Sequence, residues 1–147
     1  MTEQEHIKKW IDHAREKFAD FTATFKQFDG ISTLDWRHKN GSFDYYMRVI
    51  FDEDRECMYI SGDLGDAVFQ FTEKAMIERI SRYSSFYYFM EKMQCSSDEY
   101  INDGLTDRLS ECDPDYREWL YCAGRRIHPR VIIWWTALKL AAKQLGK

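Results

Sequence analysis

Apolar residues recur every three or four positions over the first 26 residues, which is the pattern of an amphipathic helix with one face turned to a core. Thr2 and Glu5 have the spacing of a capping box, in which each side chain satisfies a backbone N–H of the first turn. We therefore predict a helix over residues 3–26. Its apolar positions are Ile7, Trp10, Ile11, Ala14, Phe18, Phe21 and Phe25.

The period then changes to two around Asn40-Gly41, a dipeptide typical of a tight β-hairpin turn. A two-residue turn at this point would set Trp36 opposite Tyr45 on one face of the hairpin and Arg37 opposite Asp44 on the other. The residues then expected on the core face of the second strand are Phe43, Tyr45, Met47, Val49 and Phe51.

The rest of the chain predicts two more strands and then a helical half. The expected strands span 56–61 and 67–71, and the expected helices span 73–94 with a break at 84–85, 96–112, a stretch from 113, and 129–147. Pro114 and Pro129 stand where proline is tolerated, at the first position of a helix. The last helix is apolar over most of its circumference, so it belongs in the centre of the fold.

These elements predict an α+β fold in one domain, residues 1–147. An N-terminal helix precedes an antiparallel sheet of three to four strands, and the C-terminal half is helical with a buried last helix. The composition agrees, because 44% of the residues are hydrophobic and 16% are aromatic. Chains that remain disordered lack this apolar area.

The net charge of −4 is too small to indicate nucleic-acid binding by itself. The charges are unevenly placed: residues 96–118 hold eight acidic and two basic side chains, whereas residues 125–147 hold six basic side chains and no acid. Either the two regions pack together and neutralise each other, or one of them forms a binding surface.

No motif in the chain predicts catalysis or a bound metal, and we expect neither an enzyme nor a cofactor. Residues 52–63 resemble a calcium loop, but Cys57 stands where the loop needs glycine. Cys112, Cys122 and His128 lack the close ligand pairs of structural zinc sites, so buried thiols are the simpler interpretation. Without paired cysteines, a signal sequence or a membrane-length apolar stretch, we expect reduced thiols and a cytoplasmic location.

Three stretches of the sequence carry a resemblance to known proteins: residues 58–69 (MYISGDLGDAVF), 86–98 (FYYFMEKMQCSSD) and 137–145 (ALKLAAKQL). Together they resemble a family of small proteins of unassigned function from bacteriophages and prophages of Gram-positive bacteria. The resemblance implies an accessory protein in the cytoplasm of an infected bacterium. Small phage proteins of this kind include inhibitors of host immunity, among them anti-CRISPR proteins.

The resemblance leads to the hypothesis of a non-enzymatic inhibitor that binds a host defence protein or nuclease complex, such as a CRISPR effector. Acidic side chains would then occupy a groove meant for nucleic-acid phosphates. The expected partner-binding residues are Asp98, Glu99, Asp103, Asp107, Glu111, Asp52, Glu53 and Asp54. The alternative is a small nucleic-acid-binding or nucleotide-binding protein that uses the basic cluster of Arg125, Arg126, His128 and Arg130.

Overall fold

The structure is a computed structural model, and it describes residues 2–83, 85–97, 100–102 and 125–147. The described elements are, in chain order, α1 (Glu3–Lys17), β1 (Phe21–Gln27), β2 (Ile31–His38), β3 (Met47–Asp52), β4 (Cys57–Gly62), β5 (Ala67–Gln70), α2 (Ile77–Ile80), α3 (Phe86–Glu91), β6 (Met93–Ser96), β7 (Tyr100–Asn102), β8 (Arg125–Ile127) and α6 (Pro129–Gln144). The α+β class is confirmed.

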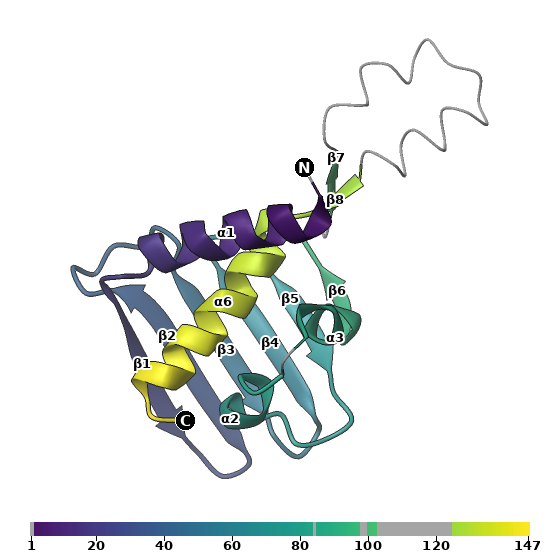
Figure 1. The fold of residues 1–147 in the computed structure, drawn as a ribbon. Helices are drawn as coiled ribbons and strands as arrows, with labels where there is room; N and C mark the ends of the chain where they lie inside the picture. The colour runs from purple at the N-terminus through teal and green to yellow at the C-terminus, as the bar shows by residue number, and fades with distance from the viewer. Residues whose placement is uncertain (1, 84, 98–99, 103–124) are drawn as a thin grey trace.

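A six-stranded antiparallel sheet forms the base of the fold, with the strands in chain order from β1 to β6. This sheet is larger than the predicted three to four strands. All four described helices lie on one of its faces, where α6 runs diagonally across the strands and α1 crosses one end (Figure 1). A separate pair, β7 and β8, lies near the start of α1, where His6 Nε2 is 2.8 Å from the carbonyl oxygen of Ile127.

The first helix begins as predicted but ends early. The Thr2 hydroxyl accepts a hydrogen bond from the Glu5 N–H at 3.1 Å, and the Glu5 carboxylate accepts one from the Thr2 N–H at 2.7 Å, which confirms the capping box. The helix stops at Lys17, so the prediction of a helix to residue 26 is wrong. Residues 21–27 form the edge strand β1 instead, because the apolar residues there also alternate and the intervening threonines favour a strand.

The hairpin is correct in kind, but its predicted register is wrong. Trp36 pairs with Met47 and not with Tyr45, because residues 39–46 form a longer loop. The shift is by two residues, so the faces of β2 and β3 are preserved, and Met47, Val49 and Phe51 are buried as predicted. Phe43, however, is 65% exposed and does not lie in the core.

The two strands that follow this hairpin are confirmed as β4 and β5. The helical stretch expected over residues 73–94 does divide into two helices on either side of the predicted break at 84–85, but the helices do not fill the predicted length. These short helices are α2 and α3, and Ser85 caps α3 by accepting a hydrogen bond from the Tyr88 N–H. The predicted acidic helix does not begin at Ser96, because this residue ends strand β6. Residues 100–102 of that predicted helix form strand β7, which also contradicts it. Residues 98–99 and 103–112, like the helix expected from residue 113, lie outside the described residues.

The last helix, α6, is the centre of the core, as predicted. It starts with Pro129, and the residues from Val131 to Leu138 are all buried. Near its end the Gln144 amide donates to the Phe21 carbonyl oxygen and accepts from the Ala23 N–H, so it pairs with the edge of β1. Among the described residues no helix is both long and apolar enough to cross a membrane.

Candidate functional site

The face of the sheet opposite the helices is not covered by any other described element, and we call it the open face. Strand residues alternate between the two faces, as the buried and exposed positions of β3 show. The register aligns the outward-facing residues into rows across the strands. The side chains on this face include Thr24, Lys26, Thr33, Asp35, Arg37, Arg48, Ile50, Tyr59, Ser61, Val68 and Cys95.

One of these rows is apolar. Ile50 on β3 pairs with Tyr59 on β4, and Tyr59 pairs with Val68 on β5. Ile50 and Tyr59 are each 38% exposed, which is high for residues in the middle of a sheet. Cross-strand neighbours of this kind form a continuous surface. The row therefore offers a flat apolar strip that a partner could bury.

The loop between β2 and β3 adds an aromatic cluster at one end of the open face, formed by Arg37, Phe43 and Tyr46. The Arg37 guanidinium lies 4.3 Å from the ring centroid of Phe43 and 5.9 Å from that of Tyr46, and the two rings meet edge to face at 5.6 Å. Arg37 also donates two hydrogen bonds to the Gly41 carbonyl oxygen. Phe43 is the most exposed large hydrophobic residue of the described chain.

An ion pair links this aromatic cluster to the rest of the open face. The Tyr46 hydroxyl donates to Asp35 at 2.7 Å, and Arg48 Nε donates to the same carboxylate oxygen at 3.0 Å. Burial and the Asp35 carboxylate raise the pKa of Tyr46. The hydrogen bond to Asp35 holds the Tyr46 ring in place beside Phe43.

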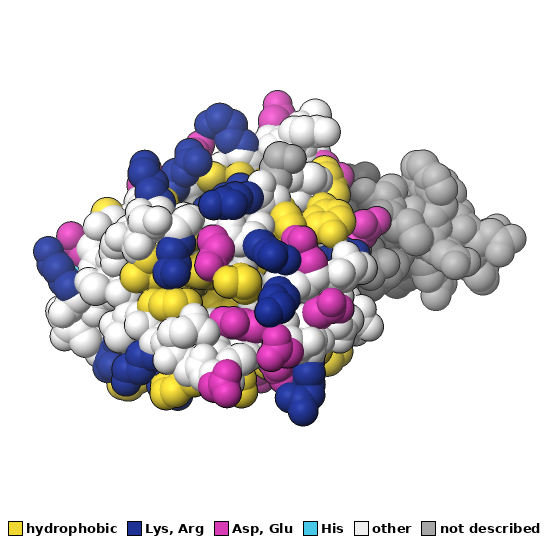
Figure 2. Space-filling view, turned by 90° about the horizontal axis from the view of Figure 1, so that it is seen from below, with side chains coloured by type: hydrophobic (Ala, Val, Ile, Leu, Met, Phe, Trp, Pro, Cys, Tyr) yellow, Lys and Arg dark blue, Asp and Glu magenta, His cyan; other side chains and the backbone are white. Residues whose placement is uncertain are grey.

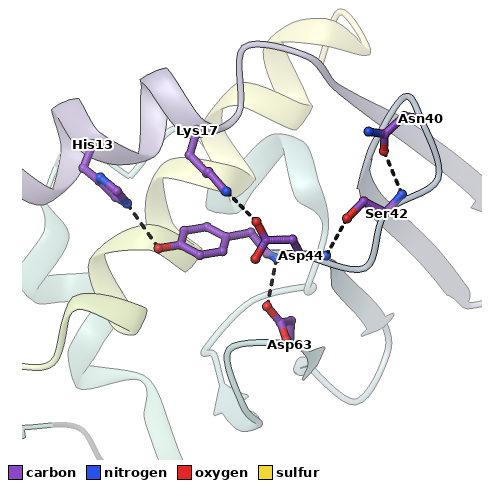
Figure 3. Close-up of polar contacts among 7 residues, drawn as sticks. His13, Lys17, Asn40, Ser42, Asp44 and Asp63 are labelled. Carbon is purple, nitrogen blue, oxygen red and sulfur yellow. Dashed lines mark hydrogen bonds and ion pairs between the residues drawn. The ribbon is translucent and has the colours of Figure 1, made fainter.

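The other side of the same loop is fixed to α1 and to the β4–β5 turn (Figure 3). The Tyr45 N–H donates to Asp63, the Tyr45 hydroxyl lies 3.1 Å from His13 Nε2, and Lys17 donates to Asp44. Tyr45 has a φ of 59°, a left-handed conformation that is uncommon for a large side chain and persists only where its surroundings impose it.

Short-range hydrogen bonds fix the tip of the loop as well. The Ser42 N–H donates to the Asn40 side chain at 2.8 Å, and the Asp44 N–H donates to the Ser42 hydroxyl at 3.1 Å (Figure 3). Gly62 lies so close beneath the loop that an added Cβ would be 2.2 Å from the Tyr46 carbonyl oxygen. The exposed Phe43 thus projects from a loop whose conformation is determined on both sides.

Each of the predicted acidic residues at the β3–β4 turn forms an ion pair or a hydrogen bond within the chain. Asp52 pairs with Arg55 at 3.3 Å, Asp54 pairs with Lys74 at 3.5 Å, and the Glu53 carboxylate accepts from Gln27. Figure 2 looks at this end of the molecule and shows acidic and basic side chains interspersed around hydrophobic patches. Exposed pairs are weak, so Asp54 remains able to contact a partner, whereas the Asp52 side chain is largely buried.

The other predicted acidic residues lie outside the described residues, so their role stays a prediction. They are Asp98, Glu99, Asp103, Asp107 and Glu111.

The basic cluster of the alternative hypothesis lies where β8 meets α6. Arg125 and Arg126 belong to β8, and His128 precedes the first turn of α6. The His128 imidazole accepts a hydrogen bond from the Arg130 N–H at 3.1 Å, so it caps the helix, and the Arg130 guanidinium packs against the same ring. His128 therefore has a structural role, whichever ligand the arginines contact.

The residues considered as metal ligands are not assembled into a site within the described ranges. No group of three or more His, Cys, Asp or Glu side chains with metal-binding geometry occurs there. Within the stretch that resembles a calcium loop, residues 53–56 form the turn between the antiparallel strands β3 and β4. Cys112 and Cys122 lie outside the described residues, and Cys57 and Cys95 are free thiols.

Sequence reasoning missed the aromatic cluster because it placed Phe43 in a strand. The signal was present, since Asn40, Gly41 and Ser42 together form a polar run longer than a two-residue turn. Gly41 has a φ of 86°, which glycine adopts readily in such a loop.

Comparison of the chain with protein-family models, curated protein sequences and solved structures finds no match.

Proposed function

We propose that the protein acts by binding another protein, with the open face and its aromatic cluster as the docking surface. The observation that carries this proposal is the exposed Phe43 on a loop that is held rigidly by its own chain. Aromatic and arginine side chains dominate the energetic centres of protein interfaces. A loop already fixed in one conformation also loses little entropy when it binds.

The apolar row beside the aromatic cluster extends this surface across the neighbouring strands. Ile50 and Tyr59 present flat apolar area, and the Asp35–Arg48 pair lies between them and the cluster. Specific interfaces bury about 800 Å² on each partner, with an apolar centre and a polar rim. The open face has this arrangement, with threonine and charged side chains around the apolar residues.

The proposed partner is a host defence complex such as a CRISPR effector, which the protein inhibits as a phage-encoded accessory factor. This part of the proposal rests on the resemblance of residues 58–69, 86–98 and 137–145. Acidic residues of the protein would then contact basic residues that normally hold nucleic-acid phosphates.

The test is a plaque assay in a panel of bacterial strains, each of which carries one active CRISPR system that restricts a phage. Expression of the protein should restore plaques in at least one strain. The variant Phe43→Asp should lose this effect, because removal of an interface centre costs at least about 2 kcal/mol, or roughly thirtyfold in Kd. Phe28→Asp is the matched control, since Phe28 is 56% exposed in the β1–β2 turn, at the other end of strand β2.

Two results would contradict the proposal. If no strain regains plaques, the protein does not inhibit these defence systems. If Phe43→Asp and Phe28→Asp behave alike while circular dichroism shows both folded, the aromatic cluster is not the docking surface. Binding to plain DNA or RNA that weakens steeply with salt would favour the nucleic-acid alternative.

A further inference from the structure

A groove runs along the helical side of the molecule, on the other side of the sheet from the open face. It consists of two hollows of about 620 Å³ and 300 Å³ that share Ile11, Arg15 and Phe86, and we call them together the helical groove. The hydrophobic residues that line it come from α1, α3 and α6. They are Ile7, Ile11, Phe86, Tyr87, Trp135 and Leu140.

Two cations line the smaller hollow, and neither has an acidic partner among the residues that the structure describes. Arg15 forms no ion pair or hydrogen bond within the part of the chain that the structure describes. Lys139 donates to the Tyr83 carbonyl oxygen at 3.0 Å, and its ammonium lies 4.2 Å from the ring centroid of Trp135, but no carboxylate of the described ranges is within ion-pair distance. Burial lowers the pKa of Lys139.

Arg15 also lines the larger hollow, and the other two charged side chains there, Lys8 and Asp12, pair with each other at 2.6 Å. The helical groove is therefore mostly apolar, and it carries two positive charges without an acidic partner among the described residues, Arg15 where the two hollows meet and Lys139 in the smaller one. A ligand that complements it has an apolar face and carboxylates beside that face.

The size of the groove indicates which kind of ligand fits. One turn of an α-helix is 5.4 Å long and about 10 Å across, so it occupies roughly 400 Å³. The larger hollow thus has the volume of one to two helical turns and is open to solvent. Small-molecule sites enclose most of their ligand, whereas an open groove between helices is the form that receives an amphipathic helix.

We propose that the helical groove binds an acidic amphipathic helix of a partner protein, with its apolar side chains on Ile7, Ile11 and Phe86 and its carboxylates against Arg15 and Lys139. This contact is separate from the open face and does not depend on the function proposed for that face. A protein with both surfaces can hold two partners, or two parts of one partner, on opposite sides of its sheet.

The test uses a displayed library of 14-residue peptides as the probe. Apolar residues are fixed at helical spacing, and all other positions vary among Glu, Lys, Gln and Ala. Selection on the full chain should enrich glutamate. For the best synthetic peptide, Arg15→Gln should weaken binding at least about fivefold, and Arg15→Glu at least about twentyfold, because the latter replaces an attraction by a repulsion.

Lys9→Glu is the matched control, since it makes the same charge change on an exposed side chain of α1 that does not line the groove. It should leave the Kd within about twofold. A second variant, Lys139→Met, keeps the apolar stem and removes the charge, and it should also weaken binding. Thermal melts of all variants verify that the fold is intact.

Several results would overturn the proposal. They are a selection that enriches no peptide, an enrichment without glutamate, and binding that Arg15→Glu leaves unchanged. If the selected peptides no longer bind the Tyr59→Asp variant but still bind the Arg15→Glu variant, their binding site is the open face and not the helical groove. Decanoate is the second probe: if it binds and no peptide is enriched, the groove takes a small amphiphile instead.

Discussion

The central place of α6 leads to a quantitative prediction for Ile132→Ala. Ile132 is fully buried, and the carbonyl oxygen of the same residue accepts the Thr136 hydroxyl at 2.9 Å. Truncation to alanine removes three methyl or methylene groups, worth about 0.8 kcal/mol each in transfer free energy. The cavity left beside the helix adds about 1 to 2 kcal/mol, because the surrounding structure relaxes only in part. We expect a total loss of about 4 kcal/mol in the free energy of unfolding.

Urea denaturation followed by circular dichroism measures this loss. With a slope of about 2 kcal/mol per molar urea, the midpoint should fall by about 2 M while the slope stays constant. Lys143→Ala is the control, since Lys143 is exposed on the same helix and its replacement should cost no more than about 0.5 kcal/mol. A loss below about 1 kcal/mol for Ile132→Ala would show that α6 is peripheral and would refute the reasoning.

Three further predictions concern a glycine, a tyrosine and metal ions. Gly62→Ala should cost about 2 to 3 kcal/mol by the same urea measurement, because Gly62 has a φ of 141° and the new Cβ would meet the Tyr46 carbonyl oxygen. Burial and the Glu73 carboxylate raise the pKa of Tyr83 above 10.0. The contribution of Tyr83 to the free energy of unfolding is therefore complete below about pH 10 and declines as the pH rises further. Tyr83→Phe should flatten this decline in melting temperature at alkaline pH. Excess EDTA should leave the melting temperature unchanged, since a metal that binds only the folded state would stabilise it, and a drop of many degrees would contradict this.

The elements that could be predicted from the sequence are those with one dominant local signal. The capping box at Thr2 and Glu5 specifies the start of α1, and Pro129 specifies the start of α6. The wide apolar surface of residues 131–138 has no alternative to burial. Strands β4 and β5 and the β3–β4 turn are likewise predictable, because a run of charged residues in the turn gives way to residues of alternating polarity in the strands.

The errors arose where two patterns fit the same residues. Phe18, Phe21 and Phe25 are spaced for a helix, yet Phe21, Ala23 and Phe25 also alternate as in a strand. Pairing with β2 decides between them, and this tertiary contact is not visible in a local window. The same holds for β6, whose residues 93–96 extend the sheet only because β5 provides an edge.

The candidate site was harder to predict than the fold, because it depends on the length of one loop. A two-residue turn would have put Phe43 in the core, whereas the longer loop exposes it and brings Arg37 to its ring. The contacts that hold this loop come from distant residues, His13 and Asp63. No short stretch of sequence carries that information.

The position of α6 in the chain also affects how the protein folds as it is synthesised. All six strands of the main sheet are complete once Ser96 has left the ribosome, but α6, which covers their apolar face, begins only at Pro129. Until then Leu34, Val49 and Phe51 have no cover from this helix. The nascent sheet is thus exposed to aggregation or to chaperones for the time that the intervening residues take to emerge, and slow translation before Pro129 should lower the yield of folded protein.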